Sequence, residues 1–161
     1  FRTLRFGFET ADEDRQRETG GKTRSGDLER ALRSLRKAGY REGEVGVYLL
    51  CGLPGQSAEE ISSDIEYVRK CGARPILAEY SPIPGTALWE EAVEASPYPI
   101  AGEPLFHNNT LLPCGAGELT PERYRELKRK ALATGGRSRM MSCGRPWLWP
   151  VPRIEASQPG V

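Results

Sequence analysis

The chain contains three short segments that are rich in apolar residues. Residues 4–9 alternate apolar and polar positions, residues 45–50 are nearly all apolar, and residues 76–80 form a third apolar run. Alternation is typical of a half-buried strand, and a continuous apolar run is typical of a strand buried on both faces. The pattern therefore predicts three β-strands.

Helical patterns follow the strands. Apolar residues from Leu28 to Ala38 recur at three- and four-residue intervals and end at Gly39, a helix stop signal. Ser57 and Glu60 have the spacing of a capping box at the start of a second helix. The charged stretch between the first strand and the first of these helices, residues 11–23, is expected to begin with a helical turn.

The second half of the chain is less regular. Thr86 is expected to cap a helix that contains Trp89, and Thr120 to cap one that runs to about Ala133. Between them, from residue 96, prolines and glycines predict an extended stretch. Residues 135–161 show neither helical nor strand periodicity and are expected to be poorly ordered. We therefore expect a barrel-like unit at 1–95, an extension at 96–134 and a tail at 135–161.

Successive strand–loop–helix units predict parallel strands and an α/β fold. The parent architecture is either a barrel or a doubly wound sheet, and three strands are too few to close a barrel of the common eight-stranded kind. In both architectures the function lies where strands end. This places the candidate sites at residues 7–10, 51–56 and 80–85.

Charge and composition exclude some classes of protein. The 161 residues include 23 Lys and Arg and 22 Asp and Glu, a net charge of +1. This balance gives no general electrostatic reason for binding nucleic acid or an anionic membrane. No apolar run approaches the roughly 18 residues of a membrane-spanning helix, and the first residues lack a signal-peptide pattern. We expect a cytoplasmic protein and, because the chain opens inside a strand, a fragment.

The sequence offers no evident metal site. Cys51, Cys71, Cys114 and Cys143 are 20, 43 and 29 residues apart, so CxxC and CxxxCxxC motifs are absent. We expect free thiols, mostly buried as small apolar residues. His107 is the only histidine and is expected to form hydrogen bonds within its loop.

Each strand end has a functional and a structural interpretation. Glu9 can accept hydrogen bonds from a ligand, or it can be a solvated or helix-capping acid at a strand end. The turn containing Gly52, Pro54 and Gly55 leads into a helix N-terminus that favours a polar or negative ligand, yet it also suits a plain strand-to-helix turn. The loop that begins at Ser81 can contact a ring edge through its backbone, or simply be fixed by its prolines.

Together these loops resemble the second half of the radical S-adenosylmethionine (SAM) enzyme core. LRFGFETAD (4–12) resembles the fourth strand of that family, and VYLLCGLPGQSAEE (47–60) the fifth strand with its glycine-rich turn. ILAEYSPIPGTALWEEA (76–92) resembles the sixth strand and its Ser-Pro-x-Pro-Gly-Thr end. Residues 104–113 resemble the tail of members that carry a cobalamin-binding domain.

The resemblance implies a partial (β/α)6 barrel, a [4Fe-4S] cluster and cleavage of SAM to a 5′-deoxyadenosyl radical. Glu9 would face the ribose or ammonium group. The glycine-rich turn, with the preceding Leu50, would flank adenine, and Ser81 and Pro82 would line its other side. The residues assigned to SAM are Gly7, Glu9, Leu50, Gly52, Pro54, Gly55, Ser81 and Pro82.

The chain departs from the family in one respect. It lacks the first three strands and the three cluster cysteines, so we expect it to be inactive alone and to need the missing N-terminal half of the barrel as its partner. The small-molecule substrate and the reaction type stay open. Two alternatives remain: a non-catalytic remnant or interaction module, and a phosphate-binding piece of an ordinary (β/α)8 barrel.

Overall fold

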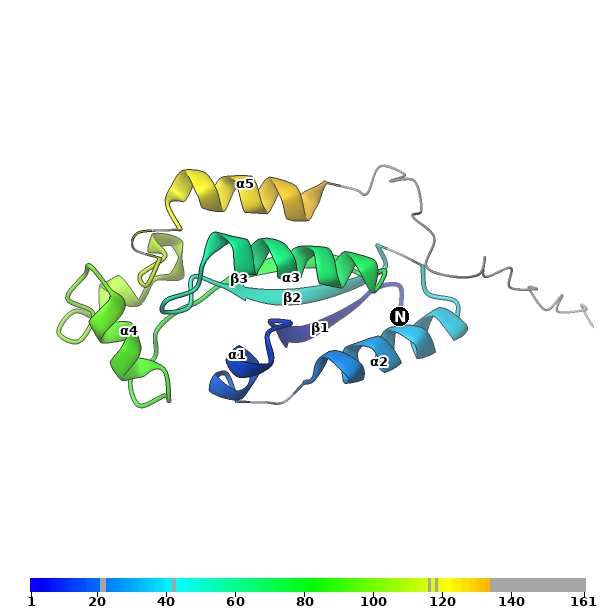
Figure 1. The fold of residues 1–161 in the computed structure, drawn as a ribbon, viewed down its shortest axis with the longest axis horizontal. Coiled ribbons are helices and arrows are strands. Elements are labelled where there is room, and N and C mark those ends of the chain that lie inside the picture. The colour runs from blue at the N-terminus through cyan, green and yellow to red at the C-terminus, as the bar shows by residue number, and fades with distance from the viewer. Residues whose placement is uncertain (21–22, 42, 116, 118, 134–161) are drawn as a thin grey trace, which may run out of the picture.

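The fold is a three-stranded parallel sheet with helices packed against it (Figure 1). A computed structural model describes residues 1–20, 23–41, 43–115, 117 and 119–133. The strands are β1 (Leu4–Glu9), β2 (Val45–Cys51) and β3 (Arg74–Glu79), in the order β1-β2-β3. Both strand pairs are parallel. The predicted α/β class and all three strands are confirmed, and the tail expected at 135–161 lies outside the described residues.

Helices connect and follow the strands. The α-helices are α1 (Glu13–Glu18), α2 (Ser25–Lys37), α3 (Ala58–Lys70), α4 (Trp89–Ala95) and α5 (Pro121–Leu132), with 3₁₀-helices at Pro104–His107 and Asn109–Leu111. The capping box of α3 is confirmed, because the Ser57 hydroxyl accepts from the N–H of Glu60 while the Glu60 carboxylate accepts from the N–H of Ser57. Thr120 caps α5 by accepting from the N–H of Arg123 at 3.2 Å.

Two expectations about the second half were wrong. Thr86 does not cap α4, since its hydroxyl donates to the carbonyl of Ile83 at 2.8 Å and the helix begins at Trp89. The stretch after residue 96 is not simply extended, because it contains both 3₁₀-helices. Strand β3 begins at Arg74, before Pro75. Proline fits there because β3 pairs only with β2 among the described residues, so its missing N–H can face the free edge.

The core lies on one face of the sheet. Val47 and Leu49 of β2 are completely buried, and they belong to one cluster with Leu32 of α2, Ile65 of α3 and Leu127 of α5. Alternate residues of a strand point to opposite faces. Helices α2, α3 and α5 therefore cover a single face, and Figure 1 shows them running alongside the strands.

The opposite face carries fewer contacts. Tyr48, which lies between Val47 and Leu49, is 42% exposed. A Cβ built on Gly46 would meet the side chains of Arg5 and Ile76, so these residues share this second face. Within the described part of the chain, no helix combines the length and apolar character needed to cross a membrane. Among the described residues, this second face is therefore the less covered of the two.

Candidate functional site at the carboxyl ends of the strands

A hollow of about 250 Å³ lies where β2 and β3 end. Leu50 comes from β2, Tyr80 and Ser81 follow β3, and residues 83 and 86–88 of the next loop complete that side. Residues 18–20, at the end of α1, form the remaining wall. Leu50 and Ser81, two of the residues assigned from sequence, thus line one hollow at the carboxyl ends of the strands.

The loop after β3 is held by side-chain hydrogen bonds. The Ser81 hydroxyl donates to the carbonyl of His107 at 2.5 Å, and the Nε2 of His107 lies 2.7 Å from the carbonyl of Ile100. His107 also packs edge-on against Trp89 at 5.3 Å between ring centroids. The expected structural role of His107 is confirmed. Pro82 is buried next to Ser81 and does not line the hollow.

Tyr80 lines the hollow, but its hydroxyl group lies in the interior of the fold. Its hydroxyl oxygen is buried and has no hydrogen-bond partner among the described residues. Burial raises the pKa of Tyr80, so the hydroxyl stays protonated and can donate at neutral pH. An unpaired buried hydroxyl is costly unless something else supplies a partner. Because this oxygen is buried, it is not open to a ligand in the hollow, whose ligand-facing surface comes mainly from apolar side chains such as Leu50, Ile83 and Leu88.

Gly7 and Glu9 lie at the end of β1. Gly7 is exposed and pairs in register with Tyr48. A Cβ built on Gly7 would meet no heavy atom within 4 Å, so packing among the described residues does not require glycine there. Glu9 is half-buried and has a φ of 72°, in the left-handed region that few non-glycine residues adopt. Neither residue lines the hollow.

The glycine-rich turn after β2 satisfies its own donors. The Oε1 of Gln56 accepts from the N–H groups of Gly52 and Leu53, at 2.9 and 3.2 Å. Gly52 has a φ of 81° and lies under Leu112, whose Cδ2 would be 3.4 Å from a Cβ at this position. These contacts bury the start of the turn and leave few free N–H groups for an anion.

The far side of the same turn is tied to α1. The Arg15 guanidinium donates to the carbonyl of Pro54 at 2.8 Å and lies 3.8 Å from the Glu60 carboxylate. Pro54 is buried, whereas Gly55, with a φ of 63°, is exposed beside Arg15. Arg15 also forms an ion pair with Glu18 at 3.6 Å, so one cation connects the turn to a wall of the hollow.

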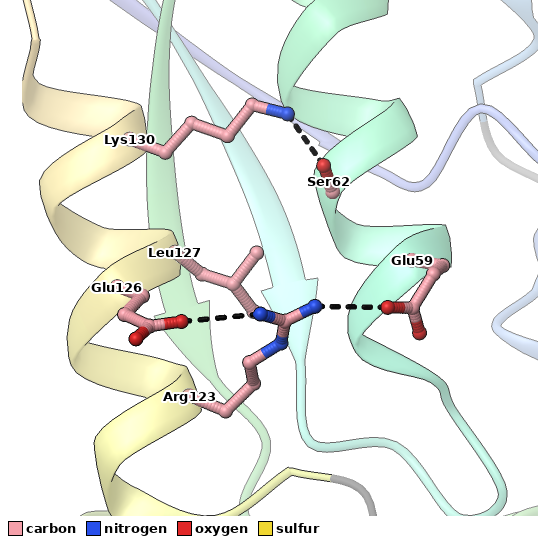
Figure 2. A pocket seen from close by; sticks show the side chains of 6 residues that line it. All are labelled: Glu59, Ser62, Arg123, Glu126, Leu127 and Lys130. Atoms are coloured by element: carbon pink, nitrogen blue, oxygen red, sulfur yellow. Dashed lines mark hydrogen bonds and ion pairs between the residues drawn. The ribbon is translucent and has the colours of Figure 1, made fainter.

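A second hollow, of about 200 Å³, lies between α3 and α5. Figure 2 shows that its charged side chains already have partners: Arg123 contacts Glu59 and Glu126, and Lys130 contacts Ser62. Most of these groups are exposed, so the ion pairs contribute little stability individually. The balanced charge here favours a helix–helix contact over a ligand site.

The described cysteines do not form a metal site. Cys51 and Cys114 are buried, Cys71 is partly buried, and all three are free thiols, as the sequence predicted. Burial raises the pKa of Cys51 to about 12 and that of Cys114 to about 11. No cluster of three or more potential ligands among His, Cys, Asp and Glu occurs within the described ranges. High thiol pKa values oppose the thiolate form that metals bind.

Sequence reasoning found part of the hollow. The strand-end rule placed a candidate site at residues 80–85, which include Tyr80, Ser81 and Ile83. It did not reach residues 86–88, because an apolar residue in a turn, such as Leu88, is only a weak sign of a lined cavity. Residues 18–20 carry no sequence signal, because only the tertiary fold brings the end of α1 against β2.

Comparison of the sequence with protein-family models gave no match, and comparison with curated proteins gave none either.

Proposed function

We propose that this chain forms part of the SAM pocket of a radical SAM enzyme, as the C-terminal half of a partial (β/α)6 barrel. One observation carries the proposal: Leu50 and Ser81, assigned to SAM from two separate sequence motifs, line the same hollow at the carboxyl ends of β2 and β3. The uncovered sheet face and the free edge of β1 among the described residues support a barrel that continues beyond them.

The hollow suits the adenine ring of the cofactor. Leu50, Ile83 and Leu88 supply apolar surface against which the ring can pack. Small-molecule sites begin at roughly 300 Å³. A hollow of about 250 Å³ therefore holds a ring-sized part of a cofactor and not the whole of it.

The other assigned residues have supporting roles in the proposal. Glu9 would accept hydrogen bonds from ribose hydroxyls or the ammonium group, and Gly7 would leave room above the sheet for the sugar. Gly52 and Gly55 would shape the turn beside adenine. SAM, when bound with its cluster, would supply radical chemistry on a substrate that this chain does not identify.

The described residues do not fit the iron–sulfur cluster. Cys51, Cys71 and Cys114 are neither grouped nor easily deprotonated, so the ligands would have to come from outside this set. We therefore assign no electron-transfer step to these residues. We propose that the chain alone is inactive and that the missing N-terminal half supplies the cluster. A link to cobalamin stays a prediction.

The phosphate-binding alternative has less support. Gln56 uses the N–H groups at the start of the glycine-rich turn, and the Glu60 carboxylate accepts from Ser57 at the α3 N-terminus. A phosphate placed there would meet a carboxylate where it needs donors. The remnant or interaction-module alternative predicts that the hollow binds no nucleoside.

Ligand titration by NMR of the isotope-labelled chain tests the proposal. Addition of 5′-deoxyadenosine, which needs no cluster, should shift the Leu50 methyl and Ser81 amide signals with a millimolar Kd. Leu50→Glu should weaken binding at least tenfold, because it places a carboxylate against an apolar ring. Leu132→Glu, on an exposed residue of α5, should leave binding unchanged.

Two results would overturn the proposal. One is a folded chain whose Leu50 and Ser81 signals do not shift when 5′-deoxyadenosine is added. The other is a response to ribose 5-phosphate centred on the glycine-rich turn, which would support the ordinary barrel.

A further inference from the structure

The end of β1 contains a strained turn. The N–H of Thr10 donates to the carbonyl of Phe8 at 2.9 Å, which closes a three-residue γ-turn around Glu9. Because Glu9 has a φ of 72°, this is the rare positive-φ form of the γ-turn, which is sterically unfavourable for residues with a Cβ. Such strain persists only where the surrounding contacts hold it in place.

Contacts on both sides hold this turn. Phe8 is 1% exposed and stacks against Tyr67 of α3 at 5.8 Å between ring centroids. The carbonyl of Thr10 accepts from the Nε2 of Gln16 at 2.8 Å. Thr10 and Gln16 are both buried, so water does not compete for this hydrogen bond. The residue before Glu9 and the residue after it are thus fixed independently.

A buried carboxyl group completes the support. The Oδ1 of Asp64, on α3, accepts from the backbone N–H of Ala11 at 2.8 Å. Asp64 is 4% exposed, and its Oδ2 is buried with no hydrogen-bond partner in the described part of the chain. This contact joins α3 to the turn across 53 residues of sequence. A buried carboxyl group with one unpaired oxygen is energetically costly, so its presence needs a physical explanation.

The surroundings place the titration of Asp64 near neutral pH. Burial raises its pKa to about 6, although the Ala11 N–H and the Thr10 hydroxyl act to lower it. The carboxylates of Asp12 and Glu60 face the same group and raise it further. Arg15 lies 3.8 Å from Glu60 and partly offsets that charge. Asp64 therefore changes charge within the range of pH that a cell can reach.

We propose that Asp64 is a positioning residue that clamps the turn around Glu9, and that the clamp weakens when its carboxylate is neutralised. A hydrogen bond to a charged acceptor is roughly twice as strong as one to a neutral acceptor. Ionised Asp64 holds the Ala11 N–H and with it the strained turn, whereas protonated Asp64 holds them less firmly. The position of the Glu9 carboxylate, which the turn fixes, therefore depends on pH. That this alters cofactor binding rests on the proposed function, but the clamp itself does not.

An NMR pH titration of the full chain tests the clamp. Between pH 4.5 and 8, the Ala11 amide proton should shift downfield with a midpoint near pH 6, as Asp64 ionises. The coupling between the amide and Hα protons of Glu9, which reports its φ, should change with the same midpoint. In Asp64→Asn, which keeps an acceptor oxygen without a charge, both signals should be independent of pH in this range. Asp27→Asn, which removes a partly exposed carboxylate of α2, should titrate like the wild type.

Three outcomes would overturn the inference. If the Ala11 amide shift shows no midpoint near pH 6, Asp64 does not titrate as proposed. If the shift still titrates in Asp64→Asn, another group causes it. An Ala11 response without a Glu9 response means that Asp64 does not position Glu9. If the clamp titrates as expected but the chain does not bind 5′-deoxyadenosine, only the proposed function is contradicted.

Discussion

At the scale of single residues, Glu9 is the position where local preference and tertiary structure disagree. Its sequence context predicts a strand end, and its φ of 72° is instead that of a strained turn. The register with β2 shifts between Gly7 and Glu9, so the turn also interrupts the regular ladder. Irregularities of this kind at a strand end commonly re-aim a side chain. The strain is therefore consistent with a functional role for the carboxylate.

Comparison of Glu9→Gly with Glu9→Ala tests the strain. In an ordinary strand, glycine is less stable than alanine by roughly 0.5–1 kcal/mol. Here the order should reverse, with Glu9→Gly more stable by about 1 kcal/mol, because only alanine has a Cβ that opposes positive φ. Urea unfolding monitored by circular dichroism measures the difference. If alanine is the more stable, the turn is unstrained in solution.

At the scale of elements, polar contacts fix α5 to the sheet. The Tyr124 hydroxyl donates to the Glu79 carboxylate at the end of β3, and the Lys128 ammonium lies 3.1 Å from the same carboxylate. Burial acts to raise the pKa of Glu79, but the hydrogen bond from Tyr124, one from a backbone N–H and the contact with Lys128 together outweigh it and hold the pKa below its usual range. The contacts connect a helix to a strand more than 40 residues earlier in the chain.

Helix ends are joined in a similar way. Arg36 of α2 donates to the carbonyl of Cys71, just after α3, and Arg69 of α3 donates to the carbonyl of Ala133 at 2.7 Å, just after α5. Each arginine thus satisfies a carbonyl at the end of another helix and complements its dipole. This arrangement aligns the three helices over the same face of the sheet.

Tyr124→Phe should destabilise the chain by about 1.5–3 kcal/mol at pH 7, the usual contribution of a hydrogen bond to a charged group. Because Glu79 has a lowered pKa in the fold, its contribution is present above pH 4.5 and is lost as the pH falls through its folded pKa. The loss caused by Tyr124→Phe should therefore shrink below pH 4. Urea unfolding of both chains at pH 7 and below pH 4 measures this loss of stability.

The control for this experiment is a double-mutant cycle with Glu79→Gln. If the contact carries the effect, Tyr124→Phe should cost much less in the Glu79→Gln background. A pH-independent cost that is unchanged in that background would assign the effect to packing of the ring.

At the scale of the whole molecule, the two faces of the sheet differ. One is covered by three helices, and the other presents Tyr48 with Ile76 and Arg5 beside it. Parallel sheets occur almost only with both faces covered. The described residues thus leave apolar surface and two strand edges open to association.

This arrangement predicts self-association of the 161-residue chain. Sedimentation velocity at increasing concentration should show aggregates or dimers, and Tyr48→Glu should shift the population toward monomer by placing a charge on the open face. Leu105→Glu, at a residue that is 78% exposed in a 3₁₀-helix, should have little effect. A wild-type chain that stays monomeric and unfolds cooperatively at high concentration would contradict the prediction.

The sequence by itself determined the local elements of this protein. Alternation and apolar runs predicted all three strands, and the Ser57 and Thr120 caps predicted the starts of two helices, because these signals depend on neighbours within a few residues. The strand-end rule also selected Ser81, whereas Leu50 was assigned only through the resemblance to the radical SAM core. The same local reasoning failed at Thr86, whose hydroxyl found a backbone carbonyl in its own loop.

Only the tertiary structure decided which of these pieces meet. Residues 18–20 reach the hollow, and Asp64 reaches Ala11, through contacts between segments far apart in the sequence. No periodicity encodes such contacts, since they depend on how helices pack across the sheet. The positive φ of Glu9 follows from the same cause. A strained turn forms when long-range contacts on both sides outweigh the local preference of the residue between them.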